Sequence, residues 1–111
     1  MQMSDYQYGA VTVLKLDGSL SQEISGRFAA YFRDHVSKSL GRVVIDATSV
    51  HFVDSSGLEC LLVLSDEVGR IGHTLRICGA SETVSEVMDL TGIRNRFEHF
   101  EDVASAVRSI E

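Results

Sequence analysis

The chain has 111 residues, of which 44% are apolar and 23% charged, and its formal net charge is -6. This length suits one domain over residues 1–111 that buries roughly two-thirds of its unfolded surface, and the composition is that of a folded globular protein. Ten basic residues against sixteen acidic ones leave no positive stripe, so we expect no nucleic-acid binding. No apolar run could span a bilayer, and residues 1–6 do not resemble a signal peptide. We therefore expect no direct membrane insertion and a cytoplasmic location.

Neither the cysteines nor the histidines are spaced like a metal site. Cys60 and Cys78 each lie inside an apolar segment, which predicts two buried thiols and no disulfide framework. The four histidines are dispersed and lack the close pairing of zinc ligands. We expect no metal and no cofactor.

The first part of the chain predicts two strands and a helix. Val11–Leu16 is rich in β-branched and aliphatic residues and ends at Asp17-Gly18, and Met3–Tyr8 could pair with it as a short antiparallel strand through a Gly9-Ala10 turn. A helix then begins after Ser21, which can act as its N-cap, and closes at Leu40-Gly41. Its apolar face repeats at three- and four-residue intervals and is formed by Ile24, Phe28, Tyr31, Phe32, His35 and Val36.

Strands and helices alternate through the rest of the chain. The continuous apolar run Arg42–Asp46 is typical of a central strand covered on both faces. Later segments follow in the order helix from Ser56 to Gly69 or Gly72, strand Thr74–Cys78, helix from the Ser81 cap to Gly92, strand Arg96–Phe100 and helix Glu101–Ile110. This alternation predicts an α/β fold: a mixed, mostly parallel sheet of four to five strands with about four helices.

Two neighbouring serines stand where the central strand leads into the next helix. Ser56-Gly57-Leu58-Glu59 fits a capping box, in which Ser56 accepts from the Glu59 amide and Glu59 reaches back to the Ser56 amide. Ser55 would then lie one position before the cap, with its hydroxyl free to face solvent. A phosphate on Ser55 would lie near the positive end of the helix dipole, so the fold could carry it. The alternative is an ordinary polar turn.

The stretch Asp54-Ser55-Ser56-Gly57-Leu58, after the hydrophobic strand and Val50-His51-Phe52-Val53, resembles the signature of STAS domains, particularly bacterial anti-sigma-factor antagonists. The element order agrees over nearly the whole chain, and residues 88–93 (Met-Asp-Leu-Thr-Gly-Ile) resemble the family's segment before its last strand.

The resemblance implies that Ser55 is phosphorylated. It also implies a partner-switching module whose unphosphorylated form binds an anti-sigma factor that is a serine kinase. Phosphorylation would release this partner, and a PP2C-type phosphatase would restore binding. Two positions depart from the family pattern, because Ser21 follows the Gly-x-Leu turn where many antagonists have an acidic residue, and Glu59 stands where glycine is common.

Two other functions remain as alternatives. A catalytic Ser55 assisted by His51 or Asp54 is disfavoured because the Gly-x-Ser-x-Gly elbow is missing, so we expect no enzyme and no catalytic residue. A constitutive STAS-like scaffold, bound to a transporter or a signalling assembly without phosphorylation, would use the same surface. The predicted partner-binding residues are Ser21, Asp54, Ser55, Ser56, Gly57 and Glu59, with Val63 also exposed on the same helix.

Overall fold

The computed structural model describes residues 1–110, which form five strands, four α-helices and one short 3₁₀ turn. The order is β1 (Gln2–Tyr8), β2 (Val11–Leu20), α1 (Gln22–Ser39), β3 (Val43–Val53), α2 (Ser55–Arg70), β4 (Arg76–Cys78), α3 (Glu82–Leu90), the 3₁₀ turn (Arg94–Arg96), β5 (Glu98–Phe100) and α4 (Val103–Arg108). This is the α/β fold with a mixed sheet that the sequence predicts.

The strands lie in the order β1-β2-β3-β4-β5 within one sheet. Strand β1 pairs with β2 antiparallel, with Tyr8 opposite Val11, and every later pair of neighbours is parallel. The antiparallel hairpin that the sequence predicts at its start is therefore confirmed. Gly9 adopts a positive φ of 63° in the two-residue turn, a conformation that glycine reaches without a steric penalty.

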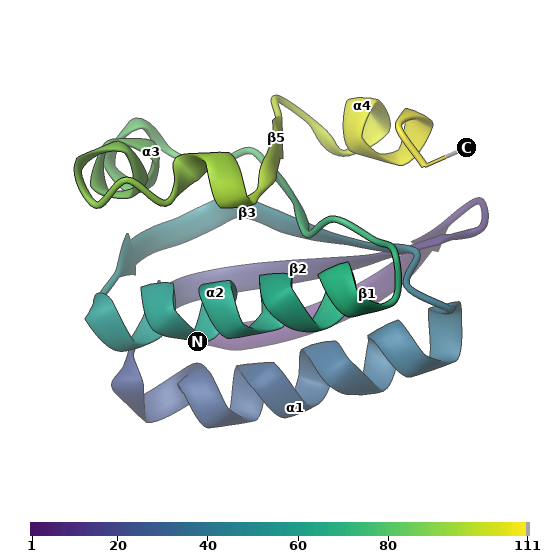
Figure 1. Ribbon diagram of the computed structural model, residues 1–111, viewed down its shortest axis with the longest axis horizontal. Coiled ribbons are helices and arrows are strands. Elements are labelled where there is room, and N and C mark those ends of the chain that lie inside the picture. The colour runs from purple at the N-terminus through teal and green to yellow at the C-terminus, as the bar shows by residue number, and fades with distance from the viewer. Residues whose placement is uncertain (111) are drawn as a thin grey trace.

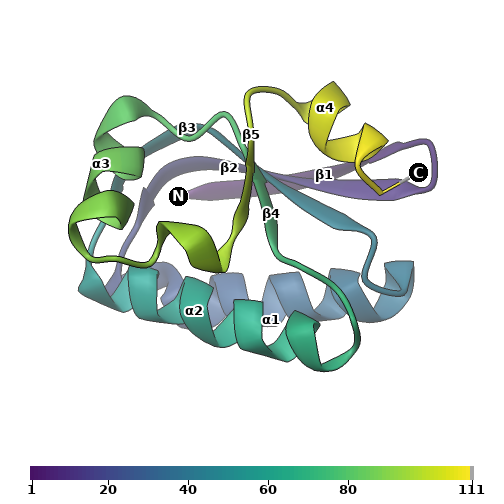
Figure 2. The ribbon, with the colours of Figure 1, turned by 45° about the horizontal axis from the view of Figure 1, so that its top comes forward.

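The helices cover the sheet unequally. Helices α1 and α2 lie side by side under one face, α3 lies at the end of the sheet where β3 finishes, and α4 crosses the opposite face (Figures 1 and 2). The larger core joins α1, α2 and α3 to the sheet through fully buried residues such as Phe28, Leu64 and Met88. The smaller core lies under α4, where Ala106 and Val107 pack against Val11, Val13, Val44 and Cys78.

The two long parallel strands run further than the sequence pattern predicts. β2 continues past Asp17-Gly18 to Leu20, because the ladder with β3 absorbs an irregularity on each side of Gly18, whose φ is 124°. β3 continues beyond Asp46 to Val53. Asp46 stays in the strand because its Oδ1 accepts from the Thr48 amide at 3.0 Å and from the Thr48 hydroxyl at 2.6 Å.

The elements near the C-terminus are shorter than predicted. β4 begins at Arg76 instead of Thr74, and Arg94–Arg96 turns as a 3₁₀ helix before β5 begins at Glu98. Helix α4 occupies only Val103–Arg108, with Asp102 as its N-cap. Its inward side chains include Ala106 and Val107, which are buried.

Candidate functional site at the start of α2

Asp54 links the end of β3 to the first turn of α2. It is the N-cap residue, with extended backbone, and its Oδ1 accepts from the Gly57 amide at 2.8 Å. Its own amide donates to the Leu20 carbonyl oxygen at 3.2 Å, at the end of β2. The helix therefore begins at Ser55.

This geometry corrects the predicted capping box. The cap is Asp54 and not Ser56, which already lies inside the first helical turn, and Glu59 is an exposed residue of the next turn. Aspartate and serine are similarly good N-caps, so local preference does not separate them. The carboxylate has a second acceptor oxygen that a serine lacks, and α1 uses it.

The first turn of α1 meets the same carboxylate. Asp54 Oδ2 accepts from the Gln22 amide at 3.0 Å, across 32 positions of sequence. Ser21 occupies the N-cap position of α1, as predicted, but its side chain makes no capping bond; its carbonyl accepts from the amides of Ile24 and Ser25. The predicted site residue Ser21 is thereby brought next to the Asp54-Ser55-Ser56-Gly57 turn.

Gly57 permits this close approach of the two helix starts. It is buried, and a Cβ placed on it would lie 2.3 Å from the Leu20 carbonyl oxygen and 2.9 Å from Val53 Cγ1. Real Cβ atoms do not come this close to backbone oxygen, so any larger residue must push α2 away from the end of β2. Glycine is required here for space.

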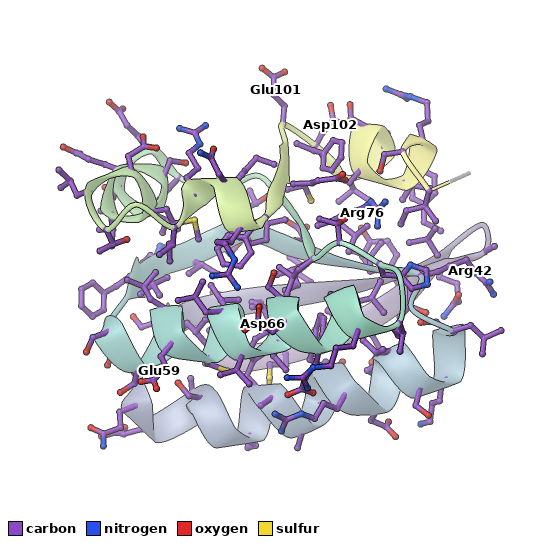
Figure 3. All side chains as sticks on the ribbon, viewed as in Figure 1. Arg42, Glu59, Asp66, Arg76, Glu101 and Asp102 are labelled. Atoms are coloured by element: carbon purple, nitrogen blue, oxygen red, sulfur yellow. The ribbon has the colours of Figure 1, made fainter. Side chains whose placement is uncertain are left out.

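The two serines differ in surroundings, as the sequence predicts, but for another reason. Ser55 is the first residue of α2 and is exposed, whereas Ser56 is half-buried and lines a shallow groove of about 290 Å³ between α1 and α2. The groove is formed by Ser25, Gly26, Ala29, Arg33, Ser56, Glu59, Cys60, Val63 and Leu64. Figure 3 shows Glu59 at the beginning of α2, on the side that faces α1.

Charges along the groove are arranged unevenly. At its far end, the Arg33 guanidinium forms two hydrogen bonds of 2.7 and 2.8 Å with Glu67 and lowers the pKa of that carboxyl. At the serine end the exposed charged residue of the groove is Glu59. Positive potential at the serine end comes from the backbone amides in the first turns of α1 and α2.

Asp54 and His51, the residues that could assist a nucleophilic Ser55, differ in their surroundings. Both oxygens of Asp54 accept from backbone amides, and His51 is exposed on β3. Among residues 1–110, no group of three His, Cys, Asp or Glu side chains is placed to hold a metal ion. Cys60 and Cys78 are buried free thiols, as predicted.

The sequence analysis does not identify two features of the site, the exposed side chain of Phe52 and the backbone amide of Gln22. Phe52, two positions before Asp54, is 53% exposed at the end of β3. Its signal is weak in sequence, because an apolar residue in a strand is normally expected to be buried. No sequence pattern predicts the contact of the Gln22 amide with Asp54, since that contact depends on how the helices pack.

This sheet order, with an Asp-Ser-Ser-Gly turn at the start of the helix after the long central strand, is the arrangement of a STAS-type α/β domain. The sequence model of the STAS domain family matches residues 2–106, and the chain belongs to that family. The resemblance of the sequence is thereby confirmed.

Solved structures agree with this assignment. A Thermotoga maritima protein described as an anti-sigma factor antagonist superposes with a TM-score of 0.88 at 16% identity, covering 97% of this chain and 93% of that one. The Bacillus cell fate determinant SpoIIAA, solved in a phosphorylated form, has a TM-score of 0.69 at 16% identity, over 99% of this chain and all of SpoIIAA. At such identities the likeness establishes the fold.

A different relative is similar in sequence. Prestin of Meriones unguiculatus is 38% identical over 61 residues, which is 55% of this chain but only 8% of prestin. Within residues 1–110, none of the helices combines the length and apolar character needed to cross a membrane.

Proposed function

We propose that this STAS domain is an anti-sigma-factor antagonist that works as a phosphorylation-controlled partner switch. In its unphosphorylated form it binds an anti-sigma factor that is also a serine kinase. That kinase phosphorylates Ser55 and is released, and a PP2C-type phosphatase restores binding. The protein acts in the cytoplasm by binding and is not itself an enzyme.

The observation that carries this proposal is the division of labour between Asp54 and Ser55. The cap of α2 is supplied by the Asp54 carboxylate, so the exposed Ser55 hydroxyl has no capping role in the unmodified protein and is free to receive a phosphate. A phosphate there carries about -1.5 to -2 charges and lies at the positive end of α2.

The same charge is large enough to release a partner. Two like unit charges about 6 Å apart at an effective dielectric constant of about 20 repel by about 3 kcal/mol. A tenfold loss of affinity needs only about 1.4 kcal/mol. A partner that places an acidic or apolar surface over Ser55 would therefore be displaced.

The structural neighbours support this function. The Thermotoga maritima protein and SpoIIAA are both described as anti-sigma factor antagonists, and SpoIIAA has both a phosphorylated and an unphosphorylated form. We extend these properties to Ser55 on the strength of the shared fold and the Asp-Ser-Ser-Gly turn.

Phosphorylation tests the first step. The protein is incubated with its cognate anti-sigma factor kinase and ATP, and the modified residue is located by mass spectrometry. We expect phosphate on Ser55, loss of modification in Ser55→Ala, and full modification in the matched control Ser56→Ala. Modification of Ser56 alone, or none from a kinase that binds the protein, would refute the proposal.

The prestin match favours a second candidate, a constitutive interaction domain in a transporter or signalling assembly. Such a domain would use the surface around Ser55 without phosphorylation. The two functions differ in one result: a switching partner phosphorylates Ser55 in the presence of ATP and is then released, whereas a constitutive partner binds and leaves Ser55 unmodified. An adjacent gene for an ATP-binding serine kinase or a PP2C phosphatase would favour switching, and adjacent transporter genes the scaffold.

A further inference from the structure

One carboxylate joins the starts of the two helices that form the groove. Asp54 accepts from the Gly57 amide of α2 through Oδ1 and from the Gln22 amide of α1 through Oδ2, at 2.8 and 3.0 Å. Because Ser21 makes no side-chain cap for α1, Asp54 provides the side-chain acceptor at both helix starts.

We propose that Asp54 is a positioning residue that transmits phosphorylation of Ser55 to the first turn of α1. The coupling rests on the proposed function, since it needs a charge at Ser55, but the link between the helices exists in the unmodified protein. The partner surface then includes the first turn of α1, around Gln22 and Glu23, as well as the first turn of α2.

The coupling follows from the position of the phosphate. Ser55 follows Asp54 in the chain, so a phosphate on the Ser55 hydroxyl adds negative charge beside the Asp54 carboxylate. The phosphate oxygens are strong acceptors and compete for the amides at the start of α2. Repulsion and competition both act to move the Asp54 carboxylate away from its present partners.

A displaced carboxylate affects α1 more than α2. When Asp54 moves, the phosphate can replace it near the Gly57 amide, because both belong to the first turn of α2. No side chain of α1 replaces it at the Gln22 amide, since Ser21 does not cap that helix. The Gln22 amide is therefore the group at which phosphorylation should be felt most clearly outside α2.

The link is tested first without phosphate. Asp54→Ser keeps a good N-cap for α2 but is too short to reach α1. We expect the Gln22 amide to exchange with water about tenfold faster by NMR, equivalent to about 1.4 kcal/mol, while the Gly57 amide changes by less than about threefold. Asp102→Ser, the same change at the N-cap of α4, is the control and should leave Gln22 unchanged. Unchanged exchange at Gln22 in a folded Asp54→Ser protein would overturn the link.

The coupling is tested with the charge in place. In the parent chain, phosphorylation of Ser55 should shift the Gln22 amide resonance and speed its exchange, and Asp54→Ser should abolish this response. If no kinase phosphorylates the protein, Ser55→Glu introduced into the parent chain and into Asp54→Ser supplies the negative charge instead. Asp54→Asn, which keeps one acceptor oxygen for Gly57 but turns an amide toward Gln22, serves if Asp54→Ser does not fold.

The outcomes separate the two proposals. If Ser55 is never phosphorylated, the proposed function fails, while the Ser55→Glu pair still decides the coupling. If Gln22 responds to the charge equally with and without the Asp54 carboxylate, or does not respond at all, the coupling is wrong and the switch itself can stand. A purely structural Asp54 would alter stability without removing the charge-dependent response at Gln22.

Discussion

Gly57 is the position where the packing of the site is most sensitive to a single atom. Gly57→Ala adds a Cβ that would lie 2.3 Å from the Leu20 carbonyl oxygen, and that oxygen cannot retreat without moving the end of β2. Alanine raises helix propensity by about 1 kcal/mol, but overpacking costs about 1–3 kcal/mol. Weakening the hydrogen bond to the Asp54 carboxylate costs about 1.5 kcal/mol more. We expect a net loss of about 2 kcal/mol in the free energy of unfolding.

Urea and thermal unfolding measure this loss, which corresponds to a fall of roughly 8 °C in the midpoint for a domain of this size. Gly26→Ala is the matched control, because Gly26 lies in α1 with no atom within 4 Å of its added Cβ. It should stabilise the protein by up to about 1 kcal/mol. If Gly57→Ala is as stable as the parent chain, the close approach of α2 to β2 is not as described.

Three further predictions concern other parts of the fold. Because Arg33 lowers the pKa of Glu67 below its usual 4.5, their ion pair stabilises the fold above that pH and the stabilisation is lost as the pH falls through the lowered pKa. Both side chains are partly exposed, so Glu67→Gln should lower the free energy of unfolding, measured in urea at neutral pH, by at most about 1 kcal/mol. An equally large loss near pH 3 would contradict the predicted pH dependence. Cys78 is 1% exposed, and burial together with the nearby negative charges of Asp46 and Asp102 raises its pKa to about 12. At pH 8 it should therefore react with a thiol reagent roughly a hundredfold more slowly in the folded protein than in urea. Equal rates would show that the smaller core is open to solvent. Ser81→Ala should cost about 1 kcal/mol, because Ser81 caps α3 at the Val84 amide, and hydrogen exchange that increases elsewhere but not in α3 would argue against that role.

Much of the fold could be predicted because its helices are amphipathic and its core strands apolar. The helical repeat that includes Phe28 and Phe32 identified α1, and the Ser81 cap identified the start of α3. Strand ends were less predictable, since polar residues such as Asp46 bond within the strand instead of ending it. The pairing of β2 with β3 decides their length, and that pairing depends on residues far apart in sequence.

The candidate site was predictable in location but not in detail. The turn with Ser55 stood out because polar residues follow a buried strand, and Ser55 is exposed as predicted. The capping residue was assigned two positions too late, because Asp54, Ser55 and Ser56 are all good N-caps and only the end of β3 decides between them. The contact of Asp54 with the Gln22 amide lies beyond local sequence, since it follows from the packing of α1 against α2.

The central claim is that a phosphate on Ser55 controls partner binding. It is tested most directly by isothermal titration of the cognate anti-sigma factor kinase into the unmodified protein and into protein fully phosphorylated on Ser55. We predict a Kd at least about tenfold higher for the phosphorylated form, a change of about 1.4 kcal/mol or more. Equal affinity for the two forms would contradict the account.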